Sequence, residues 1–194
     1  MRNYRYLLSS ILFILNFSAN AQDTSATVNR YSFFISTHLA VPYKGTEHVL
    51  TPGINFAGTV FYNVSPSVKL GIEVSDQING GKNSFKSFNA VSADFVVKWF
   101  PTALFDKVSK KVDEQFLKNF YLELGMGHNF SHLAADGISS IKTGIGYKVP
   151  LKNGNLIDLK LINRGFILKN KVSVNEGDYS VLTFINFSVG YGFR

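Results

Sequence analysis

The feature that most constrains this chain is a two-residue alternation of apolar and polar side chains that continues to the C-terminus. In the last stretch, Tyr179 to Arg194 (YSVLTFINFSVGYGFR), every odd position up to Phe193 is apolar, aromatic or threonine. The even positions are mostly Ser, Asn, Gly and Arg, with Leu182 and Phe184 as exceptions. Because successive side chains of a strand point to opposite faces, this period predicts a strand with one apolar and one polar face.

Seven further segments repeat this alternation and are separated by turn-forming residues. They lie within residues 30–41, 54–63, 68–75, 91–99, 120–127, 140–149 and 157–167. No run after the N-terminal region reaches the roughly 18 apolar residues that a membrane helix needs. Eight amphipathic strands of about ten residues predict an all-β fold, namely an eight-stranded antiparallel up-and-down transmembrane β-barrel.

The two faces distinguish this barrel from a secreted soluble β-sandwich or lipocalin-like barrel, in which the apolar face points inward. The polar faces combine charge with many glycines, which suits a narrow interior where backbones approach closely. The apolar faces carry aromatic residues near strand ends, as the girdles at the two lipid–water boundaries require. These aromatic residues are Tyr62, Trp99, Tyr147, Tyr191 and Phe193. The sequence therefore favours the membrane barrel over the soluble protein.

The N-terminal residues have the parts of a secretory signal peptide. Arg2 and Arg5 give a positive start, an apolar run follows, and residues 19–21 (Ala-Asn-Ala) form an A-x-A cleavage site. We therefore expect a signal peptide at 1–21 and an exported outer-membrane β-barrel domain at 22–194. Removing the signal reduces the net charge from +7 to +5. This surplus fits anionic lipid head groups better than nucleic acid, which an exported chain seldom meets.

The connections between segments give the strands a consistent direction. With the N-terminus in the periplasm, residues 63–67 and 150–155 become short periplasmic turns. The predicted outward loops are residues 42–52, 79–84, 133–137 and 169–178. An even number of strands returns the C-terminus to the periplasm, as in bacterial barrels.

One periplasmic connection, residues 101–119, is longer than a turn. Leu104, Val108, Val112 and Phe116 recur there every four residues, with charged residues between them. This spacing predicts a short amphipathic helix. The helix either caps the lower rim of the barrel or lies on the head groups of the inner leaflet.

Together, the signal, the eight segments, the short turns and the aromatic final strand resemble the small eight-stranded outer-membrane β-barrel family of Gram-negative bacteria, the outer-membrane protein A and X type. The resemblance covers the mature chain. It implies an outer-membrane location, contact with outer-membrane lipids and lipopolysaccharide, and a monomer. It also implies that the barrel-assembly machinery reads the final strand. In the family that strand usually ends on Phe, whereas FSVGYGFR ends on Arg194.

The interior of an eight-stranded barrel is just wide enough for side chains to fill it. The inward positions carry both signs of charge and are Arg30, Lys69, Glu73, Asp94, Lys98, Glu123, Lys142, Lys148, Asp158, Lys160 and Arg164. We expect Glu73, Asp94, Glu123 and Asp158 to pair with Lys98, Lys142, Lys160 and Arg164, since isolated charges in a dry interior are costly. This predicts a filled, non-conducting lumen with a structural or surface-interaction role. A small channel is the alternative.

A second alternative is a lipid A-modifying hydrolase in the same barrel. The stretch GMGHNFSHLAADG contains His128, Ser131 and His132, and lipid A deacylases that resemble this fold carry a His-x-Ser pattern. Here His128 and Ser131 are three residues apart, so on a strand they face opposite sides. The nearby Glu123 shares the parity of Ser131, not of His128. Only a bulge would reunite the three groups, so we expect no enzymatic activity and no catalytic residue.

Other chemistry has little support in the sequence. The chain has no cysteine, which excludes disulfides, thiolate metal sites, catalytic thiols and a lipid-modified cysteine anchor. It has no H-x-x-x-H motif, P-loop or dinucleotide-binding fingerprint. His38 and His48 have no acidic cluster near them in the sequence. We therefore expect neither a metal nor a cofactor.

Overall fold

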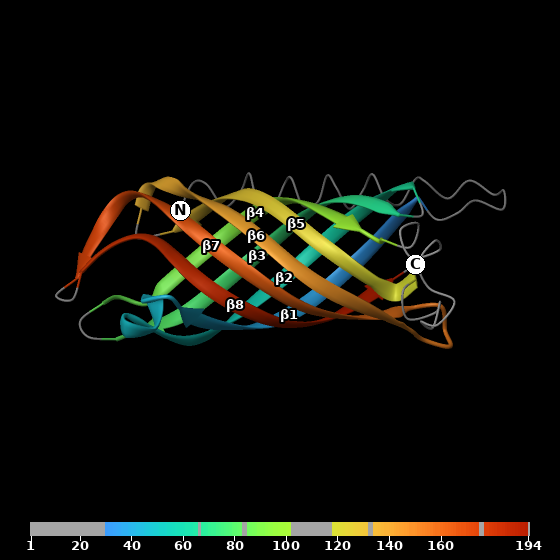
Figure 1. Ribbon diagram of the computed structural model, residues 1–194, viewed down its shortest axis with the longest axis horizontal. Helices are drawn as coiled ribbons and strands as arrows, with labels where there is room; N and C mark the ends of the chain where they lie inside the picture. The colour runs from blue at the N-terminus through green and yellow to red at the C-terminus, as the bar shows by residue number, and fades with distance from the viewer. Residues whose placement is uncertain are drawn as a thin grey trace, which may run out of the picture.

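Eight antiparallel strands close on themselves to form a β-barrel (Figure 1). Each strand pairs with its neighbours in the sequence, and the last strand pairs with the first. The strands are β1 (Tyr31–Tyr43), β2 (Leu50–Ser65), β3 (Val68–Gly81), β4 (Phe88–Trp99), β5 (Phe120–Ser131), β6 (Ala134–Pro150), β7 (Leu156–Val174) and β8 (Gly177–Phe193). The predicted all-β, up-and-down barrel of eight strands is confirmed.

The computed structural model describes residues 30–65, 67–82, 85–101, 118–131, 134–174 and 177–193, with the backbone alone at 134–138, 169–174 and 177–179. The signal peptide predicted at 1–21 and nearly all of the helix predicted at 101–119 lie outside these residues. Within them, helical structure is confined to the 3-10 turn Thr46–His48 and to residues 118–119, so the predicted amphipathic helix has no support. No helix in the described ranges is long and apolar enough to cross a membrane.

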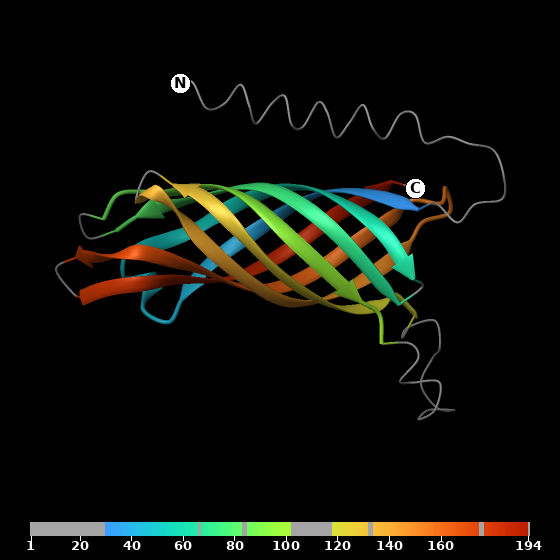
Figure 2. The same cartoon turned by 90° about the horizontal axis from the view of Figure 1, so that it is seen from above.

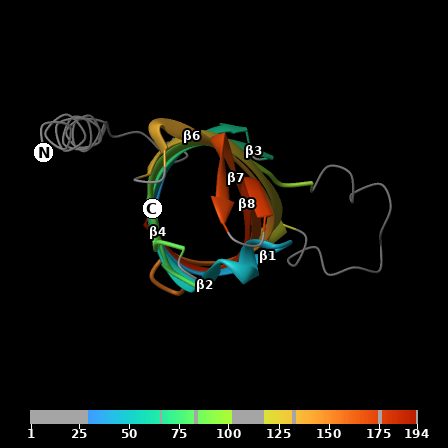
Figure 3. The ribbon, with the colours of Figure 1, turned by 90° about the vertical axis from the view of Figure 1, so that its left-hand side faces the viewer.

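The register of the strands sets the width of the barrel. Following paired residues from Tyr31 once round all eight strands leads back to Val41, ten residues further along β1. An offset of this size over eight strands corresponds to a strand tilt of roughly 40°. The end-on view shows the resulting closed ring (Figure 3). At this size, side chains are expected to fill the interior.

The two ends of the barrel differ in the strand ends and connections that lie there. β1 begins and β8 ends at one of them, the termini end (Figures 1 and 2). The β1–β2, β3–β4, β5–β6 and β7–β8 connections lie at the opposite end, the loop end. This grouping of connections is the one that the sequence predicted.

Strands extend into all four of the predicted outward loops. β1 ends at Tyr43 and β2 begins at Leu50, inside the predicted loop 42–52, and β3 ends at Gly81, inside the predicted loop 79–84. β6 begins at Ala134, inside the predicted loop 133–137. β7 and β8 remain paired as far as Val174 and Gly177, inside the predicted loop 169–178. The predicted loop bounds were wrong because the alternation of side chains ends before the backbone pairing does. Backbone hydrogen bonds extend a ladder without any contrast between its two faces.

Burial follows the alternation along every strand, with the large apolar side chains on the outside. On β8, Phe187 and Val189 are 53% and 60% exposed, whereas Asn186 and Ser188 between them are buried. Exposed large apolar side chains occur on all eight strands. Aromatic residues form a girdle at the termini end and include Tyr31, Tyr62, Trp99 and Phe193. This distribution is the reverse of that in a soluble barrel.

Apolar side chains form a cluster inside the barrel toward each end. At the loop end, the rings of Phe88, Phe166 and Phe184 contact one another at centroid distances of 5.0 to 5.8 Å and form a loop-end plug with smaller apolar residues. Toward the termini end, Phe34 and Phe61 pack edge to face at 5.8 Å and form a termini-end plug with Val96 and Leu156. Buried charged side chains lie between these two plugs.

Glycines on the inner face make room for the larger interior side chains. A Cβ atom at Gly146 would overlap the ring of Tyr121, and one at Gly127 would overlap the carboxylate of Asp94. The sequence predicted a narrow interior from these glycines, and their close contacts confirm it.

Candidate functional site

Eight charged side chains meet in the middle of the barrel and form what we call the charge network. It consists of Glu73, Asp94, Glu123, Asp158, Lys98, Lys142, Lys160 and Arg164. These residues come from the five strands β3 to β7, and all of them are buried. Four carboxylates balance four cations, so the predicted pairing of these eight residues is confirmed.

The part of the network next to the termini-end plug is centred on Lys98. Its Nζ lies 2.6 Å from Asp158 Oδ2 and donates to the hydroxyl of Tyr121 at 3.1 Å. The Tyr121 hydroxyl in turn donates to Asp158 Oδ1 at 2.5 Å. The same ammonium lies 4.6 Å from the centroid of Phe61 and 4.9 Å from that of Phe34. Hydrogen bonds and aromatic faces together offset the cost of burying this charge.

Glu123 lies at the centre of the network. Its carboxylate is 3.7 Å from Lys98 Nζ, 3.9 Å from Lys142 Nζ and 3.8 Å from Lys160 Nζ. Neither of its oxygens has a hydrogen-bond partner among the described residues. Glu123 therefore stabilises three ammonium groups by electrostatic attraction rather than by a directional hydrogen bond.

Lys142 and Lys160 connect Glu123 to the remaining carboxylates. Lys142 Nζ binds Glu73 Oε1 at 2.6 Å and lies 3.5 Å from Asp94. Lys160 Nζ lies 3.8 Å from Glu73 Oε2. Each of these two ammonium groups therefore lies between at least two carboxylates of the network.

Arg164 joins the network to the loop-end plug. Its Nη2 atom binds Asp94 Oδ2 at 2.7 Å, and its Nη1 atom donates to Ser75 Oγ at 3.1 Å. The guanidinium carbon lies 4.7 Å from the ring centroid of Phe166. Ser140 Oγ donates to the other oxygen of Asp94 at 2.9 Å.

Three predicted inward residues lie outside the network. Lys148 is buried, with its Nζ 4.5 Å from the ring centroid of Phe100. Lys69 is half-buried at the termini end. Arg30 is exposed at the termini end, and its inward position stays a prediction. It precedes β1, and the alternation does not fix a side chain beyond the end of the strand.

The residues of the hydrolase alternative are divided between the two faces of the barrel wall. Glu123 is buried in the charge network, whereas His128 is exposed on the outer face of β5, its ring 5.1 Å from that of Phe130. A register shift does occur between Asn129 and Ser131. It nevertheless leaves Glu123 and His128 on opposite faces. The third candidate, His132, lies outside the described residues.

Another serine–histidine pair, which the sequence reasoning missed, lies inside the lumen. Ser36 Oγ and His38 Nε2 are 3.0 Å apart, and both residues are buried. Their spacing of two residues on one strand places them on the same face, which is the signal that could have revealed them. In the described part of the chain, no group of three or more His, Asp or Glu side chains could hold a metal ion.

Comparison with solved structures finds matches to a surface protein and to outer-membrane proteins. Neisserial surface protein A matches with a TM-score of 0.56 and 9% sequence identity, over 86% of this chain and 97% of that one. Outer membrane protein AlkL in lipid bilayers matches with a TM-score of 0.48 and 13% identity, over 90% and 96%. The outer membrane enzyme PagL matches with a TM-score of 0.39 and 11% identity, over 83% and 99%.

At these identities the likeness shows the fold alone, and the two weaker matches support no further step. No protein-family model matches the sequence, and no curated protein matches it either. The likeness to Neisserial surface protein A shows that this surface protein has a similar fold.

Proposed function

We propose that this chain is an integral outer-membrane β-barrel protein with a structural or surface-interaction role and a filled lumen that does not conduct ions. The observation that carries the proposal is the inverted distribution of side chains. Large apolar residues cover the outside of all eight strands, while a balanced set of eight charges occupies the inside. In water, an apolar surface of that extent would drive association. In a bilayer it contacts lipid, and the closed barrel satisfies its backbone hydrogen bonds internally.

The same proposal assigns an orientation and partners. The aromatic girdle at the termini end marks a lipid–water boundary, which we place on the periplasmic side. The hairpin connections at the loop end then face outward and carry any surface interaction. The apolar belt, which consists of the exposed large apolar side chains on the eight strands, contacts phospholipid and lipopolysaccharide. The barrel-assembly machinery reads β8, and the protein functions as a monomer without nucleic acid or cofactor.

Fractionation of expressing cells tests the membrane assignment. We expect the chain in the outer-membrane fraction, extracted only by detergent. An unboiled sample should migrate differently in a detergent gel from a boiled one, because a folded barrel resists unfolding by the detergent. A chain that remains soluble without detergent would support the secreted soluble protein and exclude the proposal.

The hydrolase alternative has a separate test. We expect His128→Ala and Ser131→Ala to leave the lipid A of the host unchanged, because Glu123 lies inside the barrel and His128 outside it. Mass spectra of lipid A from cells with and without the wild-type protein provide the measurement. Loss of an acyl chain with the wild type, and its return with either variant, would establish the hydrolase instead.

A further inference from the structure

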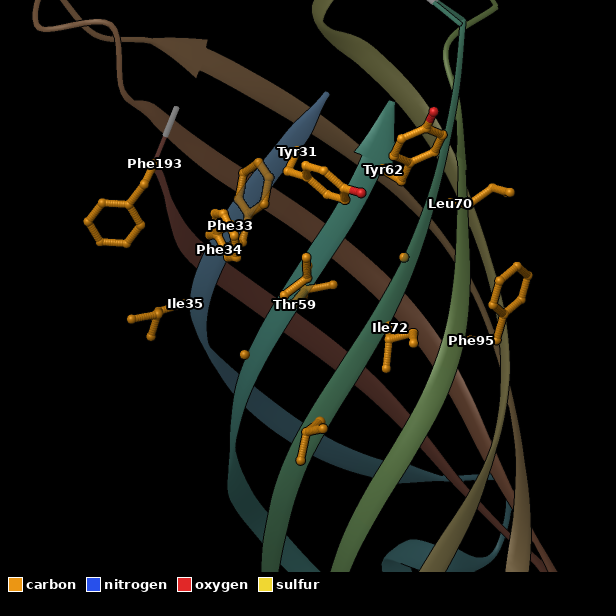
Figure 4. Close-up of a pocket in the computed structure, with 14 residues that line it drawn as sticks. Tyr31, Phe33, Phe34, Ile35, Thr59, Tyr62, Leu70, Ile72, Phe95 and Phe193 are labelled. Atoms are coloured by element: carbon orange, nitrogen blue, oxygen red, sulfur yellow. The ribbon is translucent and has the colours of Figure 1, made fainter. Parts of the chain in front are cut away.

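The outer face of the barrel contains an apolar groove of about 890 Å³ on the termini-end half of strands β1 to β4. Phe193, at the end of β8, completes one of its walls. Figure 4 shows Tyr31 and Tyr62 toward one end of the groove, and Ile35 and Ile72 further along the strands. The groove therefore runs from the aromatic girdle toward the middle of the apolar belt.

A glycine on the outer face creates the depth of this groove. Gly58 is paired with Ile35 on β1 and with Val74 on β3, and both neighbours line the groove. A Cβ atom built on Gly58 would meet no atom within 4 Å. At inner-face positions such as Gly146, a larger residue would clash with its neighbours. At position 58 a larger residue would fit, so the glycine there is not required by packing. The missing side chain leaves a trough between two rows of apolar residues.

We infer that this groove holds one acyl chain of a glycerophospholipid from the periplasmic leaflet. The inference rests on the proposed function, which places the termini end in that leaflet. The lining is almost entirely apolar along the groove, as an acyl chain requires. At the girdle end of the groove, the partly exposed Tyr31 and Tyr62 carry hydroxyl groups. Arg30, which precedes Tyr31 in the sequence, is an exposed cation.

These polar groups match the head of the same lipid. Tyrosine hydroxyls donate hydrogen bonds to ester or phosphate oxygens, and an arginine provides the charge that a phosphate needs. The ring centroids of Tyr31 and Tyr62 lie 5.4 Å apart, so both phenol side chains lie at the same end of the groove. A second copy of the barrel fits less well, because its convex outer face would bridge the trough at Gly58 rather than fill it. Lipopolysaccharide belongs to the leaflet at the loop end.

The experiment is lipid retention by the purified, full-length expressed chain in a mild detergent, counted by native mass spectrometry. Gly58→Leu fills the trough without a backbone clash. Gly165→Leu is the matched control. It lies on the outer face of β7, outside the groove, where a Cβ atom makes only an ordinary contact of 3.7 Å with Val181. We expect one phospholipid per barrel for the wild type and for Gly165→Leu, and roughly a tenfold lower occupancy for Gly58→Leu.

Heat-modifiable gel mobility of the same samples separates the two claims. Folded barrels that retain no phospholipid, or that retain it equally in all three forms, would overturn the groove assignment and leave the outer-membrane proposal intact. Retained lipopolysaccharide, or a dimer that Gly58→Leu dissociates, would also overturn it. A wild type that forms no heat-modifiable barrel would instead contradict the proposed function.

Discussion

Glu123 shows how much the interior depends on a single charge. Three ammonium groups surround its carboxylate at 3.7 to 3.9 Å, and no hydrogen bond fixes either oxygen within the described residues. Of the three lysines, Lys160 depends most on Glu123. Lys98 and Lys142 each have another carboxylate at 2.6 Å, whereas both ion pairs of Lys160, with Glu123 and Glu73, are 3.8 Å long. A buried charge that loses its partner is strongly destabilising. Glu123 and Lys160 should therefore be energetically coupled.

A double-mutant cycle measures this coupling. We expect Glu123→Gln to lower the free energy of unfolding by about 3–5 kcal/mol, because it leaves an excess positive charge in the lumen. Adding Lys160→Met to Glu123→Gln should recover about 1–3 kcal/mol relative to the sum of the single variants. Denaturant unfolding in phospholipid vesicles provides the values, with Trp99 as the only tryptophan. Additive effects would show that the two residues do not interact.

Asp76 is an acidic side chain on the outer face of β3, within the apolar belt. Its register neighbours there are Phe56 and Val91, and its Oδ1 atom has no hydrogen-bond partner in the described structure. A lipid-facing carboxylate is destabilising to an extent that depends on depth. We expect Asp76→Val to raise the free energy of unfolding in vesicles by about 1 kcal/mol. Asp76→Asn, which removes only the charge, should give a smaller gain, and a loss with both variants would indicate a stabilising role for the acid.

At the scale of the element, each strand combines two environments within one alternation. On β8 the outward row includes Val181, Phe187 and Val189, and the inward row between them includes Asn186 and Ser188. Depth along the strand should matter as much as the face. Val189 lies within the apolar belt, whereas Val181 lies eight residues nearer the loop end.

This pair of valines allows a matched test of membrane depth. We expect Val189→Arg to lower the free energy of unfolding in vesicles by roughly 2–4 kcal/mol, since the charge would lie near the middle of the bilayer. Val181→Arg, the same substitution on the same face, should cost about 0–1 kcal/mol near the interface. Equal costs at both positions would mean that the barrel does not cross a bilayer along this axis.

At the scale of the whole molecule, three layers of side chains follow one another along the lumen. The loop-end plug and the termini-end plug are apolar, and the charge network lies between them. An ion crossing the barrel would have to displace aromatic rings at both ends and break paired charges in the middle. Attraction between charges is several-fold stronger in such an interior than in water. The barrel should therefore lose stability before it conducts.

Planar-bilayer recording tests this closure directly. We expect the refolded wild type to be silent, and Glu123→Ala to be silent as well but with a lower unfolding midpoint. The two plugs should remain in the variant, because Glu123 belongs to neither of them. Heat-modifiable mobility of the same preparations shows that the barrels are folded. Steady, ion-selective openings of the wild type would make the protein a channel and would overturn the sealed lumen.

The sequence by itself determined the architecture and the contents of the lumen. Period-two alternation assigned eight strands and their inner and outer rows, because the two faces of each strand meet opposite environments. It also selected the eight charges of the network, since residues of one parity in a closed barrel must share one interior. The strand ends near the loops escaped this reasoning, because the backbone pairs there without a contrast between faces.

Only the tertiary structure decided which charges and rings meet. The contacts of Lys98 with Asp158, and of Lys142 with Glu73, join strands that are far apart in the sequence. They depend on the offset of ten residues around the barrel, which no single strand encodes. The same offset brings Ile35, Gly58 and Val74 side by side on the outer face and so forms the groove. The odd or even position of a residue along its strand determines which face of the barrel wall it lies on. The closure and register of the barrel determine which residues of other strands it contacts.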